Sequence, residues 1–443
     1  MKRFLLISTT LLLMFWSAQP QVHAANVLSS LIDMDYSGKA DTLTTALIRQ
    51  FLNQSRGTFW AVPRSQSNRD AESTYIYWQQ AHAMDVIIYS YQRIKEQQPQ
   101  LASNYQRYMK LWYANHANNW YHDDNDPTGF LNEYTDDMCW ISLTLLHMSE
   151  ALEDDKYADT ARKLFDDYIE PRGWKDNNGF WGLPWKSNDS GRNACTNSPG
   201  CLVAAKLFLK YGEEKYKETA INIYNYQANE MLTKFNNDGR VEDPPLTYTQ
   251  GTFAEACRQL YHITGETSYM QMAIKVANYL CTSSRCISNG LLRHEGTSMD
   301  QSIFKAVAIP YLTNIILDEK MTLNYRRIFV NFLLKNAKKL WANLDLDSFP
   351  ATYCNYYWGE PFDNTTVASM GAMASGASLM EQVARMSIEL TRDETSITTM
   401  QAIPSNTNGV YSLNGQLVSN GVSNRQSLPK GIYIVGKKKI AVK

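Results

Sequence analysis

The chain has 443 residues, a formal net charge of −1 at pH 7 and an aromatic content of 12%. A near-neutral chain without a stripe of clustered Lys and Arg excludes a nucleic-acid-binding protein. The 11 Trp and 27 Tyr suit carbohydrate stacking and a large helical core equally well.

The N-terminal segment has the features of a secretory leader, expected over residues 1–24. Lys2 and Arg3 make the start positive, and the apolar run of residues 4–16 precedes a small-x-small cleavage site at residues 22–24. The run is too short for a membrane-spanning helix, and no later stretch approaches the length of a span. We therefore expect export to the periplasm, the cell surface or the medium.

A repeated helical pattern dominates the region after the leader. A tyrosine is followed by apolar residues at +4, +7 and +8, which share one face of an α-helix. Copies begin, 52 to 59 residues apart, at Tyr105, Tyr157, Tyr216, Tyr269 and Tyr325. Before most copies lies a second helix that is apolar on nearly every side, such as ISLTLLHMSEAL at 141–152.

Each pair predicts a helical hairpin with one buried and one half-exposed helix. Repeats of this length indicate a closed or stacked array. Further helices, expected near residues 40–55, 75–96 and 366–386, complete six hairpins. We predict an all-α (α/α)6 barrel over residues 25–392, with an inner helix ring wrapped by an outer ring. An open α-solenoid is the alternative.

Two adjacent carboxylates, Asp136 and Asp137, stand at the head of the buried-type helix that continues through residues 141–152. In a barrel the inner helix ends line a funnel, so these carboxylates can face it. Thr135 is the expected N-cap, and the free N–H groups of a first turn favour negative charge. The two carboxyl groups are expected about 5–6 Å apart, the range of retaining glycosidases. Ordinary capping and solvation are the alternative.

The residue pattern of the sequence changes after Arg392. Polar and apolar residues alternate, Asn-Gly and Pro-Lys-Gly turns occur, and the chain ends in GIYIV and KIAVK. Such segments are typical of short strands. Residues 393–443 are therefore expected to form a small β appendage of three or four strands.

No metal or cofactor is expected. The chain has no C-x-x-C pair for a thiolate zinc site. The acidic loop with Asp123, Asp124 and Asp126 is a candidate Ca²⁺ site, with ordinary solvation as the alternative. Of seven cysteines, the close pairs 195/201 and 281/286 predict either local disulfides or isolated buried thiols.

Five segments, in order, resemble glycoside hydrolase family 76. YTDDMCW at 134–140 resembles its YDDxxW signature, and NNGFWGLPWK at 177–186 resembles its Gly- and Trp-rich loop. RNACTN at 192–197, the TYTQG segment at 247–251 and DQSIFKAVAIPYL at 300–312 resemble further family segments. The resemblance implies an (α/α)6 fold and an endo-acting α-1,6-mannanase.

For the site, the resemblance implies Asp136 as nucleophile and Asp137 as general acid/base. The reaction would be a retaining double displacement on mannan or manno-oligosaccharides, without metal or cofactor. The residues expected to contact substrate lie at inner helix heads or on Trp-rich loops. They are Trp140, Asn193, Asn197, Tyr248, Gln250, Asp300, Trp181, Trp185 and Trp358.

Each of these residues has a structural alternative: capping, core packing or, for Asp300, pairing with Lys305. His82 is expected to be a core histidine. Thr249 and Arg192 depart from the family pattern, which bears on subsite contacts rather than on the reaction.

Two other functions stay open from the sequence. One is a different (α/α)6 carbohydrate enzyme, such as an unsaturated glucuronyl hydrolase, although its uronate substrate would want a basic pocket. The other is a non-catalytic glycan-binding protein, which would not need paired carboxylates. The tail resembles C-terminal sorting domains of the type IX secretion route, and a monomer is expected.

Overall fold

The computed structural model describes most of the chain. The described residues are 28–73, 76–119, 128–363 and 365–401, with the strands at 410–412, 417–419, 431–435 and 438–442. The expected leader and the acidic loop with Asp123, Asp124 and Asp126 lie outside them. No helix within the described ranges is long and apolar enough to cross a membrane.

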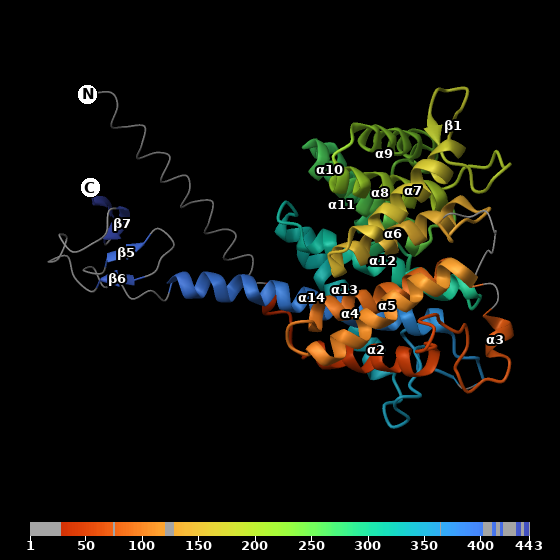
Figure 1. Ribbon diagram of the computed structural model, residues 1–443, viewed down its shortest axis with the longest axis horizontal. Coiled ribbons are helices and arrows are strands. Elements are labelled where there is room, and N and C mark those ends of the chain that lie inside the picture. The colour runs from red at the N-terminus through yellow and green to blue at the C-terminus, as the bar shows by residue number, and fades with distance from the viewer. Residues whose placement is uncertain are drawn as a thin grey trace. The chain divides into compact units, whose positions relative to one another are not determined.

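The larger of two compact units, Ser30–Glu389, consists mainly of two sets of helices that alternate along the chain (Figure 1). The inner set is α4 Trp78–Ile94, α6 Thr135–Leu152, α8 Ala194–Tyr211, α10 Thr247–Thr264, α12 Met299–Leu317 and the first part of α14 Met370–Gln401. The outer set is α2 Ser37–Phe51, α5 Pro99–Asn119, α7 Asp155–Leu164, α9 Glu214–Tyr226, α11 Thr267–Thr282 and α13 Leu323–Ala342. A short helix, α3 Arg69–Glu72, precedes α4.

The two sets differ in burial as the sequence pattern predicts. In α6 every residue from Met138 to Ser149 is buried. In α7 the buried positions are one face, formed by the repeat tyrosine Tyr157 and three apolar residues that follow it. Tyr325, the last of the repeat tyrosines, is only half-buried.

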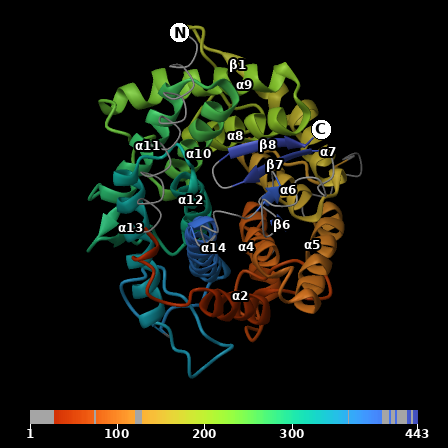
Figure 2. The ribbon, with the colours of Figure 1, turned by 90° about the vertical axis from the view of Figure 1, so that its left-hand side faces the viewer.

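The inner helices close into a ring, as Figure 2 shows when the barrel is viewed nearly end-on. Along the chain α4, α6, α8, α10 and α12 pack side by side. Helix α14 fills the remaining place, because Ser375 and Ser378 donate hydrogen bonds to the α12 carbonyls of Ser302 and Ala306 at 2.9 and 3.1 Å. The predicted (α/α)6 barrel is confirmed, and an open solenoid is excluded.

Short polar turns such as Glu153–Asp154 join the C-terminus of an inner helix to the next outer helix. All inner helices therefore run parallel, and their N-termini share one end of the barrel. Helices α10 and α12 approach so closely that a Cβ on Gly251 would lie 2.6 Å from the Cα of Ala308. This contact requires glycine in the first half of α10.

The connections from outer helices back to inner helices are longer, and two contain small antiparallel hairpins. One pairs β1 Trp174–Lys175 with β2 Trp181–Gly182, and the other pairs β3 Ile287–Ser288 with β4 Leu291–Leu292. These connections reach the end of the barrel where the inner helices begin.

The second unit includes the C-terminal strands. They are β5 Val410–Ser412, β6 Leu417–Ser419, β7 Gly431–Val435 and β8 Lys438–Val442. They form one antiparallel sheet in the order β6-β5-β7-β8, which agrees with the expected β appendage. Helix α14 runs to Gln401, past the boundary expected at residue 392.

A buried ion pair ties α2, α4 and α14 together. Arg93 donates to both carboxylate oxygens of Glu381, at 2.7 and 3.0 Å, and to Asp41 at 2.6 Å. Thr44 donates to the same Glu381 at 2.6 Å, and the Glu381 side chain has no exposed surface. The cation and hydrogen bonds offset the desolvation of this carboxylate.

We expect Glu381→Ala to destabilise the protein by about 3–5 kcal/mol, because it leaves the Arg93 charge buried without its main partner. Lys163→Ala, which removes a pair with Asp167 that is 47% exposed on both sides, is the matched control. We expect that change to cost below about 1 kcal/mol. Urea unfolding measures both, and equal losses would show that the buried pair has no special role.

Candidate active site

The head of α6 is held in place by a loop rather than by its own cap. The helix begins at Thr135, and Tyr134, at the N-cap, makes no side-chain capping bond. The expected N-cap role of Thr135 is therefore wrong. Its N–H donates to the Trp185 carbonyl at 2.8 Å, and its hydroxyl accepts from Arg172 at 3.1 Å. The loop before α8 thus fixes the first turn of α6.

Asp136 and Asp137 follow in that first turn, and both are half-buried. Asn132 donates to Oδ2 of Asp137 at 2.8 Å. The Cys195 thiol, from the start of α8, lies 3.3 Å from Oδ2 of Asp136. Oδ1 of Asp136 is buried without a hydrogen-bond partner. Among the described residues, neither carboxylate forms an ion pair.

Burial without a cation raises the pKa of both carboxyl groups. Desolvation raises the pKa of Asp136 to about 7, although the thiol, the first-turn backbone N–H groups and the Trp185 indole each act to lower it. Desolvation also raises the pKa of Asp137 well above its usual value, and the negative charges of Asp136 and Asp300 add to this rise. Asp136 can therefore change its protonation near neutral pH, and Asp137 keeps its proton to a higher pH than an exposed aspartate does.

An aromatic cluster from four inner helices lies beside the pair. Trp78 of α4 has its ring centroid 6.1 Å from those of Trp140, Tyr248 and Phe304, which belong to α6, α10 and α12. Tyr248 and Phe304 stack at 4.2 Å. Trp140 and Tyr248 are 1% and 8% exposed, so they pack beneath the carboxylates as part of the core. Trp78 is half-buried and is therefore more accessible to a ligand.

His82 lies beneath this cluster, as a core histidine. It is buried, and its Nδ1 lies 3.4 Å from Asp85, which also contacts Nδ1 of His147 at 3.0 Å. Although burial acts to raise it, the pKa of Asp85 is held below its usual value by the two histidines.

Asp300 lies at the head of α12 and is exposed. It accepts hydrogen bonds from the Trp78 indole at 2.9 Å and from Gln79 at 2.7 Å. The alternative pairing with Lys305 is wrong, because the Lys305 ammonium donates to the Tyr356 carbonyl at 2.5 Å. Sequence reasoning missed Trp78 and Gln79, whose only signal is their place at the head of an inner helix.

Three expected sugar contacts instead hold loops to helices. Asn197 is fully buried, and its amide bonds the backbone of Leu183 in both directions at 2.8 and 2.9 Å. Gln250 is fully buried and bonds the backbone of Val241 and Gly239. For these two residues the expectation of substrate contact is wrong. Asn193 caps α8 by accepting from the Thr196 N–H at 3.0 Å.

The three candidate tryptophan platforms differ in exposure. Trp185 is 38% exposed, and its indole faces Asp136. Trp181 is half-buried against Gly173, where a Cβ would lie 1.8 Å from the indole ring. Trp358 is 1% exposed and lies under the Lys305 ammonium, so its expected role as a platform is wrong. Trp185 is the best-placed of the three.

Arg192 fixes the loop that carries these tryptophans. It forms an ion pair with Asp176 and lies over the rings of Trp174 and Tyr226 at 4.2 and 4.1 Å. The departure from the family pattern at this position therefore serves loop packing.

Glu242 is a carboxylate that sequence reasoning missed. It is half-buried just before α10 and accepts a hydrogen bond from Thr249 at 2.5 Å. Burial raises its pKa to about 7, and its charge acts on Cys195 and Tyr248. It therefore faces the same region as Asp136. Its signal in the sequence is its place as an acidic residue just ahead of the TYTQG segment.

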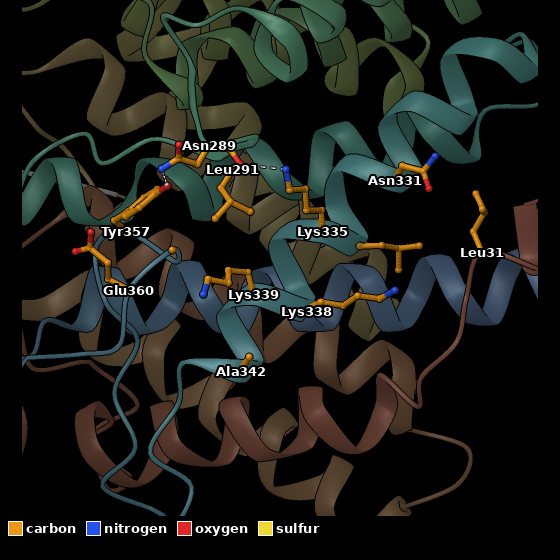
Figure 3. Close-up of a pocket in the computed structure, with 12 residues that line it drawn as sticks. Leu31, Asn289, Leu291, Asn331, Lys335, Lys338, Lys339, Ala342, Tyr357 and Glu360 are labelled. Atoms are coloured by element: carbon orange, nitrogen blue, oxygen red, sulfur yellow. Dashed lines mark hydrogen bonds between the residues drawn. The ribbon is translucent and has the colours of Figure 1, made fainter.

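All seven cysteines are free, so neither expected disulfide is formed. Within the described ranges no group of His, Cys, Asp and Glu could hold a metal ion. A separate pocket of about 630 Å³ lies along α13 and includes Lys335, Lys338 and Lys339 (Figure 3). It contains none of the candidate site residues.

Comparison with known proteins places this arrangement in context. The profile of glycosyl hydrolase family 76 matches residues 23–392. No curated relative matches the chain. The α-1,6-mannanase of Salegentibacter sp. HEL1_6 is 26% identical, with a TM-score of 0.67 over 80% of this chain and 100% of that chain.

Two further solved structures share the fold. One is an inactive variant of the Salegentibacter enzyme, in which two consecutive aspartates are replaced by alanine, in complex with an α-1,6-linked mannotetraose. It is 24% identical to this chain, with a TM-score of 0.68 over 80% of this chain and 100% of that chain. A mannosidase of family 76 from Bacteroides thetaiotaomicron aligns at 15% identity, TM-score 0.62, over 82% and 100%.

The raised pKa of Asp136 predicts a pH-dependent stability cost. The cost from Asp136 is absent below about pH 4, where this carboxyl is protonated in both the folded and the unfolded state, and it grows as pH rises towards 7. We expect Asp136→Asn to match wild type at pH 4 and to exceed it by about 1–3 kcal/mol at pH 8. Urea unfolding at both pH values measures this. Asp167→Asn, at an exposed position, is the control, and a gain at pH 8 as large in this variant as in Asp136→Asn would contradict the prediction.

Proposed function

This chain belongs to glycosyl hydrolase family 76, and from that premise we propose that it is a retaining, endo-acting hydrolase of α-1,6-mannosidic bonds in mannan. The observation that carries the proposal is the pair Asp136–Asp137. Other buried carboxylates of this protein, such as Glu381 and Asp85, have cationic or histidine partners. This pair has no such partner among the described residues. Burying carboxylates without a partner destabilises the fold, and such groups are found mainly where they serve a reaction.

The surroundings of each carboxylate support separate roles. Asp136 receives the Cys195 thiol, first-turn N–H groups and the Trp185 indole, all of which favour its anion. Asp137 faces the negative charges of Asp136 and Asp300, which favour its protonated form. We therefore assign Asp136 as the nucleophile and Asp137 as the general acid/base.

In the first step Asp136 attacks the anomeric carbon of the −1 mannose while Asp137 gives its proton to the departing glycosidic oxygen. The bond from that carbon to the oxygen breaks, and a mannosyl ester of Asp136 forms. In the second step Asp137 takes a proton from water, whose oxygen displaces Asp136 from the sugar. Retaining enzymes hold their two carboxyl groups roughly 5–5.5 Å apart and inverting ones roughly 6.5–9.5 Å apart. The separation of about 5–6 Å expected for adjacent residues supports the retaining course.

Mannan is proposed as the substrate because of the relatives and the aromatic side chains. The Salegentibacter enzyme is described as an α-1,6-mannanase, and its inactive variant lacks two consecutive aspartates. The exposed Trp185 and half-buried Trp78 beside the carboxylates can stack on the apolar faces of sugar rings. Trp181 is proposed to line the same subsites, with the buried Trp140 and Tyr248 packed beneath them.

Two rival functions are less well supported. A non-catalytic glycan-binding protein would have no reason to keep two uncompensated carboxylates. An unsaturated glucuronyl hydrolase would need cations near the pair for its uronate, and none contacts it among the described residues. We further propose that the protein is exported and acts as a monomer outside the cytoplasm.

The direct test uses linear α-1,6-mannan and sizes the products. We expect wild type to release a ladder of short oligomers, because an endo enzyme cuts internal bonds. Asp136→Asn should lower turnover at least about 10⁴-fold and keep glycan affinity. Asp137→Asn should lower it about 10²–10⁴-fold. Mannose as the sole product would contradict endo action, and full turnover by Asp136→Asn would contradict the nucleophile assignment.

The pH profile gives an independent prediction. Activity requires Asp136 ionised and Asp137 protonated, so kcat/KM should rise as pH approaches about 7 and fall again at higher pH, where Asp137 loses its proton. In Asp137→Asn, assayed on an activated aryl α-manno-oligosaccharide, the alkaline limb should disappear. An alkaline limb that persists in this variant would assign the acid to another residue.

A further inference from the structure

We propose that Cys195 is a positioning residue for Asp136: its thiol donates to Oδ2, fixes the orientation of the carboxylate and favours the anion. The inference rests on the proposed function and deepens it. Cys195 is the second residue of α8, half-buried and directed at the head of α6.

The geometry around the thiol offers its single proton two strong acceptors. Sγ lies 3.3 Å from Oδ2 of Asp136 and 3.1 Å from Oδ1 of Asn193, and Thr196 Oγ1 is more distant at 4.0 Å. Asn193 already accepts from the Thr196 N–H. A hydrogen bond to an ionised acceptor is the stronger one, so the thiol should point at Asp136 when that group is charged.

The thiol must stay protonated to act as a donor, and its surroundings ensure this. Burial raises the pKa of Cys195 well above its usual value, and the charges of Asp136 and Glu242 raise it further. A thiolate here would face two carboxylates. Cys195 is also free rather than bonded to Cys201, whose Sγ donates to the Ala220 carbonyl at 3.3 Å.

The opposite oxygen of Asp136 supports the same conclusion. Oδ1 is buried and has no hydrogen-bond partner, so the contact of the Cys195 thiol with Oδ2 carries more of the stabilisation of the anion. The titratable groups on which the charge of Asp136 acts are Asp137 and Cys139 on α6, Cys195 on α8 and Tyr248 on α10. The guanidinium of Arg172 bonds the neighbouring Thr135 hydroxyl rather than Asp136. Among the described residues no cation pairs with Asp136, so the neutral donors, Cys195 among them, control how readily it ionises.

The test compares Cys195→Ala with Cys195→Ser. Loss of the donor in Cys195→Ala should shift the acidic limb of kcat/KM on α-1,6-mannan up by about 0.5–1 pH unit, and lower the rate below that limb by about 3–10-fold. Cys195→Ser keeps a hydroxyl donor and should restore the limb to the wild-type position or below it.

Cys201→Ala is the matched control, since it removes a fully buried thiol from the same helix that bonds only a backbone carbonyl. It should lower stability and leave the limb in place. An unshifted limb in Cys195→Ala, or equal shifts in Cys195→Ala and Cys201→Ala, would overturn the positioning role.

A second readout separates this inference from the proposed function. The ¹³C resonance of the Asp136 carboxyl reports its ionisation without any turnover. A higher midpoint in Cys195→Ala than in Cys195→Ser supports positioning even if mannan is not cleaved. Equal midpoints in wild type and Cys195→Ala would overturn it even if mannan cleavage is confirmed.

Discussion

The parallel packing of six inner helices around one axis is the constraint from which the site follows. Each hairpin returns the chain to the same end of the barrel, so the first turns of α4, α6, α10 and α12 meet there. Residues as far apart in sequence as Trp78 and Asp300 become hydrogen-bond partners at 2.9 Å. The position of a side chain along its inner helix therefore decides whether it packs the core or reaches the site.

Charge compensation separates the buried carboxylates that stabilise the fold from those that are free to react. Glu381 is bound by Arg93 and Thr44, and it joins three helices. Asp136 and Asp137 receive only an amide, a thiol, an indole and backbone N–H groups. The first arrangement uses a compensated charge to join helices. In the second, burial without a cation raises the pKa of both carboxyl groups, which suits them to acid–base chemistry.

The sequence predicted the barrel because burial follows the helical period over six repeated units. It also predicted the carboxylate pair, because two charges at the head of an all-apolar helix conflict with burial. Prediction from the sequence was wrong for amide side chains, which can bind either a substrate or the protein's own backbone. Asn197 and Gln250 stand at helix heads like substrate-binding residues, but buried loop carbonyls and N–H groups need partners and take these amides.

The residues that were missed have a common cause. Cys195, Gln79 and Glu242 face the site only because loops and neighbouring helices bring them there. For Cys195 and Gln79 no local pattern indicates this, since their partners Asp136 and Asp300 lie 59 and 221 positions away. The prediction for Trp358 was wrong for a different reason. The sequence does not distinguish an exposed tryptophan from one that is buried beneath Lys305.

The short turns that follow the inner helices, such as Glu153–Asp154, have a practical consequence. They lie at the far end of the barrel, while the long connections that follow the outer helices, with the β1–β2 hairpin among them, supply the groups around Asp136. The two ends can therefore diversify independently. Natural variation in the long connections can change which glycan is accepted without repacking the ring, and fusion partners or immobilisation tags grafted at the short turns should leave access for a polymer unobstructed.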